Sequence, residues 1–196
     1  MDREKSFKNH RLEFFFKELN EIHEKLRYEF GDKYNRSLPF NEELFDRWKK
    51  AEKLNFGEGS SIYDSSFVFG KPKVGKNVWI GPFTIIDGSG ELIIGDNVTI
   101  STGSQIYTHD NIKQTLLGNS FEIEKKKVKI GRNTYIGPNV VISKGVSIGK
   151  HSVVATNSFV NKSFTEYSII AGNPAKKIGN VYIKDKNIEF KYYNEK

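Results

Sequence analysis

The chain has 196 residues, a formal net charge of +7 and no cysteine. The missing cysteine excludes disulfides, thiolate metal sites and a cysteine nucleophile, so covalent catalysis would need another residue. No apolar run approaches the ~20 residues that cross a bilayer. The N-terminus also lacks the small-residue cleavage site of a secretory signal, so we expect a cytoplasmic protein without membrane insertion.

The positive charge is spread over small groups of lysines. One group comprises Lys125, Lys126, Lys127 and Lys129, and another comprises Lys162, Lys176 and Lys177. A nucleic-acid site would combine clustered cations with aromatic residues that stack on bases, and few aromatic residues interleave with these lysines. We therefore expect a small phosphorylated ligand and no nucleic acid, with a merely soluble basic surface as the alternative.

Residues 1–56 are predicted to form an N-terminal helical region. Apolar residues recur at spacings of three and four over residues 3–30, which is typical of an amphipathic helix. Gly31 is expected to end this helix. A second helix is predicted over residues 42–54, because Asn41 can cap its first turn.

A six-residue repeat dominates residues 57–179. In its second half an aliphatic residue returns at every sixth position: Ile130, Ile136, Ile142, Ile148, Val154 and Val160. Earlier in the chain the same spacing connects Ile62, Val68, Val74, Ile80 and Ile86, and then Ile94, Ile100 and Ile106. A helix repeats about every 3.6 residues and a strand about every 2, so neither explains this period. It is the signature of a parallel β-helix built from hexapeptides.

The physical basis of the repeat predicts the fold. Each unit would form a short strand with an inward aliphatic side chain and then a turn, and three units would close one coil. Successive coils would stack about 4.8 Å apart. Each inward side chain contributes roughly 1.5–3 kcal/mol of burial, and no coil is stable by itself. The expected fold class is mainly β, with the small α-helical region at the N-terminus.

The repeat is interrupted at two places and followed by a tail. Two extra residues between Ile86 and Ile94 predict a bulge at a coil corner. Residues 107–129 depart from the repeat and are predicted to leave the coil as a loop insertion, which is usually functional or disordered. In the C-terminal tail, residues 180–196, alternating apolar residues predict an added hairpin or edge strand.

Four stretches of the repeat region resemble the hexapeptide acyltransferases of the maltose and galactoside O-acetyltransferase type and related polysaccharide-modifying acetyltransferases. They are Thr84 to Asp87, Ile94 to Val98, Gln105 to His109 and, as a C-terminal signature, Ile169 to Ile178. The resemblance covers residues 57–179. It implies a left-handed parallel β-helix, a homotrimer with one active site in each cleft between subunits, and acetyl-coenzyme A as the acyl donor along that cleft.

His109 is the candidate catalytic residue. Moving an acetyl group from a thioester to a sugar hydroxyl requires removal of the hydroxyl proton, and a neutral imidazole can accept it near neutral pH. We therefore assign His109 as general base, with a loop histidine of no function as the alternative. Transfer is expected to be direct, because the chain has neither a cysteine nor a Gly-x-Ser-x-Gly nucleophile motif. No metal is expected.

Three residues are expected on the acceptor side. Asp87 matches the acceptor-side aspartate of the family, where it would bind acceptor hydroxyls or orient the site, and a corner aspartate that only caps its own turn is the alternative. Tyr107 and Asp110 flank the base and are expected to orient it. The family usually has an asparagine a few residues before this aspartate, whereas this chain has Gly81-Pro82-Phe83. That departure leaves the identity of the acceptor open.

Five residues are expected to bind the coenzyme, by the resemblance alone. Lys162 and Lys176 occupy positions where the family has cations that meet the phosphates of coenzyme A, and Lys177 is adjacent. Tyr135 and Thr156 match cleft-wall positions near the pantetheine arm. For Tyr135, packing between subunits is the alternative.

Other functions compete with acetyl transfer to a sugar or polysaccharide precursor. A zinc carbonic anhydrase of the same architecture would need three histidines, and the repeats contain only His109 and His151. An N-acetyltransferase acting on an amino sugar nucleotide would share nearly every feature, but an amine acceptor needs a base less. A non-catalytic scaffold would have no reason to place a histidine at the start of the insertion.

Overall fold

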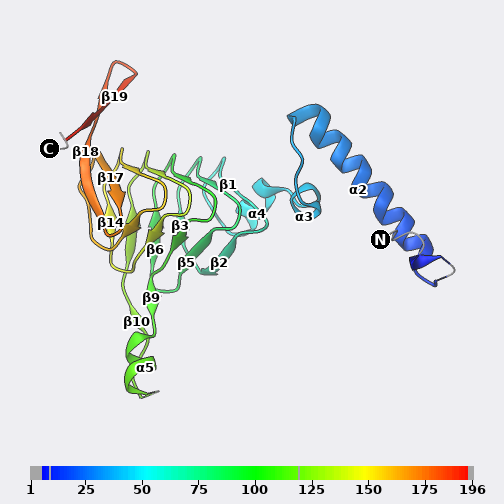
Figure 1. The fold of residues 1–196 in the computed structure, drawn as a ribbon, viewed down its shortest axis with the longest axis horizontal. Helices are drawn as coiled ribbons and strands as arrows, with labels where there is room; N and C mark the ends of the chain where they lie inside the picture. Colours follow the sequence, from blue (N-terminus) through cyan, green and yellow to red (C-terminus); the bar gives the residue numbers. More distant parts are fainter. Residues whose placement is uncertain (1–5, 9, 119, 194–196) are drawn as a thin grey trace. The chain divides into compact units, whose positions relative to one another are not determined.

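The computed structural model describes residues 6–8, 10–118 and 120–193. Contacts divide the chain into two compact units, Met1–Asp46 and Arg47–Lys196. Figure 1 shows the elements of each unit. None of the described helices is long and apolar enough to span a membrane.

The first unit contains α2 (Glu13–Tyr34) and α3 (Phe40–Leu44). The predicted helix over residues 3–30 is corrected, because α2 begins at Glu13; residues 3–5 and 9 lie outside the described part of the chain. Gly31 does not end the helix either. Asn35 does so, with a left-handed backbone at φ 50° that asparagine tolerates well.

The second predicted helix is also corrected. It is split into α3 and α4 (Arg47–Lys53), because Phe45 between them is extended with φ −103° and ψ 126°. Asn41 lies inside α3, and Pro39 occupies the cap position. In the second unit α4 packs near the first strand, where Lys50 Nζ donates to the carbonyl oxygens of Tyr63 and Asp64.

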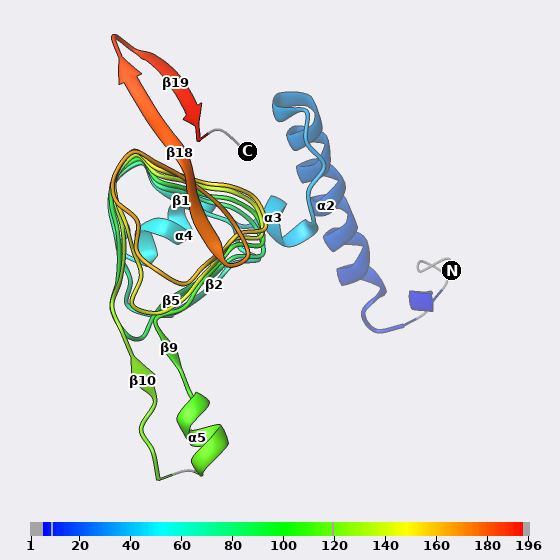
Figure 2. The same cartoon turned by 60° about the vertical axis from the view of Figure 1, so that its left-hand side comes forward.

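Three sheets form the sides of a coiled prism in the second unit. Sheet A consists, in spatial order, of β1 (Ser61–Ile62), β4 (Trp79–Ile80), β7 (Thr99–Ile100), β12 (Tyr135–Ile136), β15 (Val153–Val154), β17 (Ser168–Gly172), β18 (Ala175–Lys184) and β19 (Asn187–Tyr192). Sheet B consists of β16 (Phe159–Val160), β13 (Val141–Ile142), β8 (Gln105–Ile106), β5 (Ile85–Gly88) and β2 (Phe67–Gly70). Sheet C consists of β14 (Ser147–Ile148), β11 (Val128–Ile130), β6 (Leu92–Ile94) and β3 (Lys73–Val74). In Figure 2 the coils overlie one another and the sides of the prism can be followed.

Equivalent residues of successive coils pair in register, which confirms the predicted ladder. The parallel pairs of sheet A align Ile62, Ile80, Ile100, Ile136, Val154 and Ile170, and all six side chains are fully buried. The fold is therefore mainly β and a parallel β-helix, as the spacing predicts. Corner positions adopt left-handed backbone at Asn77, Asn97, Asn133, Asn139 and Asn157, and His151 takes the same conformation with φ 54°.

Both interruptions of the repeat occur at the corner between sheets B and C. The two extra residues form a turn after β5, in which Glu91 has φ 75° and its N–H donates to the carbonyl oxygen of Gly88. One coil later residues 107–118 and 120–127 project as an arm with β9 (His109–Asp110), α5 (Ile112–Leu117) and β10 (Glu124–Lys125), visible in Figure 1. The stack of coils thus brings the arm beside the bulged turn.

The C-terminal segment confirms the predicted hairpin. β18 pairs antiparallel with β17 and then with β19, so that Val181 faces Phe190 and Ile183 faces Ile188. This hairpin extends sheet A beyond the last coil. Val181 is buried, whereas most of the apolar residues of β19 are exposed.

Close stacking of the coils makes Gly149 sensitive to substitution. Gly149→Ala should lower the free energy of unfolding by about 1–3 kcal/mol, because its β-carbon would collide with the backbone nitrogen of Glu166 in the next coil. Gly31→Ala is the control, since its β-carbon position has no described heavy atom within 4 Å apart from the adjoining backbone of its own helix. The control should be neutral or stabilising by about 0.5–1 kcal/mol. Denaturant unfolding followed by circular dichroism measures both, and equal effects would contradict the stacking.

Candidate active site

Stacked corners bring Asp87 and His109 together. β5 pairs with β8 in the register Ile86 to Ile106, so the residues that follow these two isoleucines are neighbours in space. Asp87 ends the buried part of β5, and His109 begins the arm in the next coil. The Nδ1 atom of His109 lies 2.7 Å from Oδ2 of Asp87.

Asp87 is buried and receives several hydrogen bonds. It is only 1% exposed. Its Oδ1 accepts from the Ser89 N–H at 2.9 Å, and its Oδ2 accepts from the N–H and the hydroxyl of Thr108 at 2.7 and 2.8 Å. Burial alone would raise the pKa of the Asp87 carboxyl, but the hydrogen bonds from Ser89 and Thr108 outweigh it and hold the pKa well below its ordinary value. Asp87 is therefore a carboxylate at neutral pH.

A charged Asp87 determines which imidazole nitrogen of His109 carries the proton. A carboxylate only accepts hydrogen bonds, so Nδ1 of His109 must donate. In the neutral ring Nε2 then has a free lone pair, and Nε2 has no hydrogen-bond partner among the described residues. The His109 side chain is 36% exposed and lines a pocket of about 830 Å³. This arrangement can take a proton from a group bound in the pocket.

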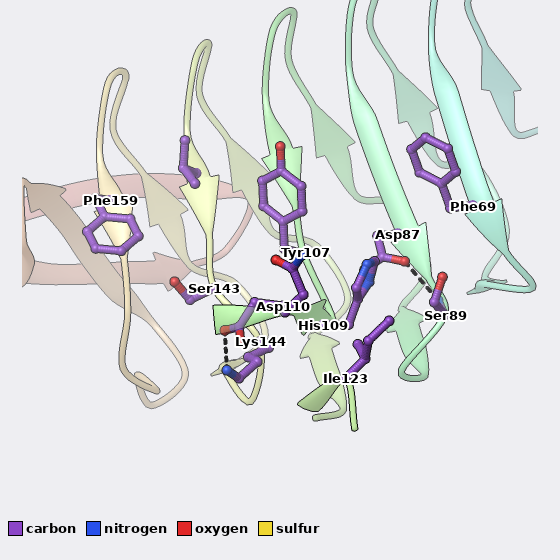
Figure 3. Close-up of a pocket in the computed structure, with 12 residues that line it drawn as sticks. Phe69, Asp87, Ser89, Tyr107, His109, Asp110, Ile123, Ser143, Lys144 and Phe159 are labelled. Carbon is purple, nitrogen blue, oxygen red and sulfur yellow. Dashed lines mark hydrogen bonds and ion pairs between the residues drawn. The ribbon is translucent and has the colours of Figure 1, made fainter. Parts of the chain in front are cut away.

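The pocket runs along the outer face of sheet B. Its wall includes the residue that directly follows the inward aliphatic residue in four successive coils, namely Phe69, Asp87, Tyr107 and Ser143. Figure 3 shows Phe69 and Phe159 at opposite ends, with Tyr107 and His109 between them. The hydroxyl of Tyr107 donates to Oε1 of Gln105 at 2.7 Å. The pocket therefore has an aromatic ring at each end and His109 between them.

Lys144 is a site residue that the sequence reading missed. It follows β13 at the same corner, one coil beyond the arm, and its ammonium contacts Oδ2 of Asp110 and lies 3.1 Å from Oε2 of Glu124. The hydrogen bond from Lys144 holds the pKa of the Asp110 carboxyl below its ordinary value, and the hydrogen bond to Asp110 raises the pKa of Lys144. The repeat could have predicted its position. Lys144 lies two residues after the inward-facing Ile142, just as Thr108 lies two residues after the inward-facing Ile106.

The acceptor-side residues gather in this pocket, whereas the predicted coenzyme residues lie elsewhere. Asp87, Tyr107, His109 and Asp110 all line it. Tyr135 is exposed on β12 of sheet A, and Thr156 is exposed in the turn between β15 and β16. Lys162 is exposed beyond β16, with Nζ 5.7 Å from the ring centroid of Phe164, and both Lys176 and Lys177 lie on β18. Within one chain these five residues do not line the pocket.

Comparison with known proteins gives consistent matches. The family model described as bacterial transferase hexapeptide (six repeats) matches residues 127–162. The carnitine operon protein CaiE of Escherichia coli K12 is 30% identical over 142 residues, covering 69% of this chain and 71% of that protein. Galactoside O-acetyltransferase of the same organism is 29% identical over 140 residues, covering 61% and 69%. The chain therefore belongs to the hexapeptide-repeat acyltransferase family.

Solved structures share the fold. The hexapeptide-repeat containing acetyltransferase VCA0836 from Vibrio cholerae superposes with a TM-score of 0.62 at 29% identity, covering 81% of this chain and 92% of that one. The N-acyltransferase AntD from Bacillus cereus, in complex with dTDP and 3-hydroxybutyryl-CoA, gives a TM-score of 0.58 at 21% identity, covering 69% and 89%. At that identity the likeness to AntD concerns the fold alone.

Replacing the buried carboxylate should destabilise the protein in a pH-dependent way. Asp87→Asn should cost roughly 1–3 kcal/mol at neutral pH, because an amide nitrogen would face N–H and O–H donors. The pKa of Asp87 is depressed in the folded state, so its stabilisation is complete above the unfolded pKa near 4 and is lost as the pH falls toward the folded value. The stability difference between wild type and variant should thus shrink as the pH falls below about 4. Urea unfolding between about pH 5 and pH 2 measures it, and a difference that grows below about pH 4 would contradict the ionised carboxylate.

Proposed function

We propose that the protein transfers an acetyl group from acetyl-coenzyme A to a hydroxyl of a sugar or polysaccharide precursor, with His109 as general base. One observation carries the proposal: a buried carboxylate holds the imidazole through Nδ1, Nε2 has no partner among the described residues, and the side chain lines a pocket. A carboxylate, an imidazole and an open nitrogen are the parts that general-base catalysis needs. The resemblance to galactoside O-acetyltransferase supports a hydroxyl as acceptor.

The proposed reaction is a direct acyl transfer. Nε2 of His109 accepts the proton as the acceptor oxygen attacks the thioester carbonyl, and a tetrahedral oxyanion forms. The carbon–sulfur bond then breaks, and the imidazolium returns its proton to the departing thiolate, so that an ester and free coenzyme A result. Asp87 stabilises the imidazolium between these two steps through its 2.7 Å hydrogen bond to Nδ1.

The contacts of Asp87 favour an orienting role over direct binding of the acceptor. Its oxygens already accept from Ser89, Thr108 and His109, and it is 1% exposed. Little lone-pair capacity remains for a substrate hydroxyl. Tyr107 and Ser143, which line the pocket with half-buried side chains, are better placed to contact the acceptor.

We further propose that the donor lies between subunits of a homotrimer. The predicted coenzyme residues lie outside the pocket of their own chain, on sheet A, in the turn before β16 and beyond β16. In a closed ring of three subunits, a surface of one prism faces a different surface of the next. Tyr135, Thr156, Lys162, Lys176 and Lys177 would then meet coenzyme A opposite the neighbouring subunit's pocket.

Two alternatives remain distinguishable. N-acetylation of an amino sugar nucleotide finds a parallel in AntD, but that likeness is one of fold. A scaffold without activity would leave the Asp87–His109 pair without a purpose. The identity of the acceptor therefore distinguishes O-acetylation from N-acetylation, and turnover distinguishes an enzyme from a scaffold.

Loss of the base should abolish most of the activity. With acetyl-coenzyme A and a panel of free sugars, glycan chains and amino sugar nucleotides, release of free thiol should identify the acceptor class. His109→Ala should then lower kcat by roughly 10²–10⁴ with coenzyme binding unchanged, as expected for removal of a general base. His151→Ala is the control, because His151 lies at another corner and stacks on Tyr167. A small loss of rate on an amine acceptor would favour N-acetylation, and silence across the panel would favour the scaffold.

The phosphate contacts can be tested separately from the chemistry. Lys162→Ala combined with Lys176→Ala should raise the KM for acetyl-coenzyme A about tenfold or more and leave the KM for the acceptor unchanged, because ammonium groups bind phosphates. Lys73→Ala combined with Lys129→Ala on sheet C removes the same charge from another face and should change neither value. A rise in the acceptor KM alone would overturn the assignment.

The active protein should sediment as a trimer, and a fully active monomer would contradict the shared cleft.

A further inference from the structure

His109 lies on an arm that does not belong to the coil ladder. Among the described strands, β9 and β10 form a separate two-stranded antiparallel sheet. His109 pairs with Lys125 and Asp110 pairs with Glu124. The position of the imidazole relative to Asp87 therefore depends on the side chains that fasten the base of the arm to the rigid coils.

One fastening comes from the preceding coil. Asp87 accepts hydrogen bonds from the N–H and the hydroxyl of Thr108, and the N–H of Gly90 donates to the same hydroxyl at 2.8 Å. A β-carbon on Gly90 would collide with the carbonyl oxygen of Thr108, so the bulged turn lies directly against the arm. These contacts hold the arm from one side only.

The second fastening comes from the following coil, through Lys144. This residue lies at the corner after β13, between two buried residues of the ladder, Ile142 and Val146. Its side chain is 16% exposed, and its ammonium contacts Asp110 on β9 and Glu124 on β10. Figure 3 shows Asp110 directed toward Lys144 while His109 is directed toward Asp87. The short strand β9 is thus held between the two neighbouring coils.

Charge makes this contact more than an incidental ion pair. Asp110 and Glu124 are direct partners across β9 and β10, and two carboxylates in such positions repel one another. The Lys144 ammonium bridges them. Hydrogen bonds from Lys126 and Lys144 lower the pKa of Glu124 to about 2, so both carboxylates are charged at neutral pH and need a cation between them.

We propose that Lys144 is a positioning residue: by bridging Asp110 and Glu124 it keeps β9 and β10 paired and holds His109 against Asp87. The inference rests on the proposed function of His109 as base. Lys144 acts through the arm and takes no part in proton transfer. Its effect should therefore appear in the rate of the chemical step more than in the binding of acetyl-coenzyme A.

The test compares matched lysine variants by the release of free thiol. Lys144→Met keeps the length of the side chain and removes the charge, so kcat should fall roughly 10- to 100-fold, as misplacement of a catalytic group does. The KM for acetyl-coenzyme A should stay within about twofold, and Lys144→Arg should recover most of the rate, because a guanidinium can bridge the same carboxylates. Lys126→Met is the control: Lys126 also binds Glu124, at 2.7 Å, but does not contact Asp110 and is 58% exposed. It should change kcat by less than about twofold.

Two double variants separate positioning from general stability. Asp110→Asn in the Lys144→Met background removes the repulsion across the strands and should restore part of the lost rate. In the His109→Ala background Lys144→Met should have no further effect, because the residue it positions is missing. Thermal unfolding of every variant shows whether a loss of rate merely follows a loss of fold.

The outcomes distinguish this inference from the proposed function. A His109→Ala variant as active as wild type would reject His109 as the base, whatever Lys144 does. A strongly impaired His109→Ala together with an unaffected Lys144→Met would reject the positioning role alone. Equal losses of rate for Lys144→Met and Lys126→Met would also reject it, because the effect would then come from Glu124 or from surface charge.

Discussion

The hydrogen bond between Asp87 and His109 depends on the in-register stacking of coils. Because Ile86 pairs with Ile106, the residues after them meet at the same corner, although 22 positions separate the carboxylate from the imidazole in the chain. The buried ladder fixes that register, since a slip by one residue would turn every aliphatic side chain out of the core. The core of the prism therefore also determines the geometry of the site.

Electrostatics then gives the site its chemical character. A buried carboxylate normally tends toward the neutral form, but the donors of Ser89 and Thr108 keep Asp87 charged. On the other side of β9 a second charged group, Lys144, bridges two facing carboxylates. The strand that carries the imidazole is thus held between a negative and a positive side chain on neighbouring coils, and Nε2 of His109 has no partner among the described residues.

The spacing of the sequence predicts the repeats far better than the helices. A period of six predicts which side chains point inward, so the ladder from Ile62 to Val160 follows from residue positions alone. Ile170 joins the same ladder in the structure, although it falls outside the period. The N-terminal helices lack such a constraint: α2 has no buried residue among those described, so nothing in the pattern determines that it starts at Glu13 or passes through Gly31. The family resemblance assigned both Asp87 and His109 to the site, but their direct hydrogen bond follows only from the stacking of the coils. The sequence alone does not identify Lys144, because its role depends on its position one coil beyond the arm. The positions of the proposed coenzyme residues relative to the pocket depend on a neighbouring subunit.

The position of the proton on His109 tests the account most directly. Long-range ¹H–¹⁵N correlation spectra of the imidazole, assigned with the His109→Ala variant, distinguish the two neutral tautomers at a pH where the ring is uncharged. The account predicts a proton on Nδ1 and a bare Nε2, with Asp87→Asn weakening that preference. A proton on Nε2 in the wild-type protein would contradict it, because the nitrogen that faces the pocket could then accept nothing.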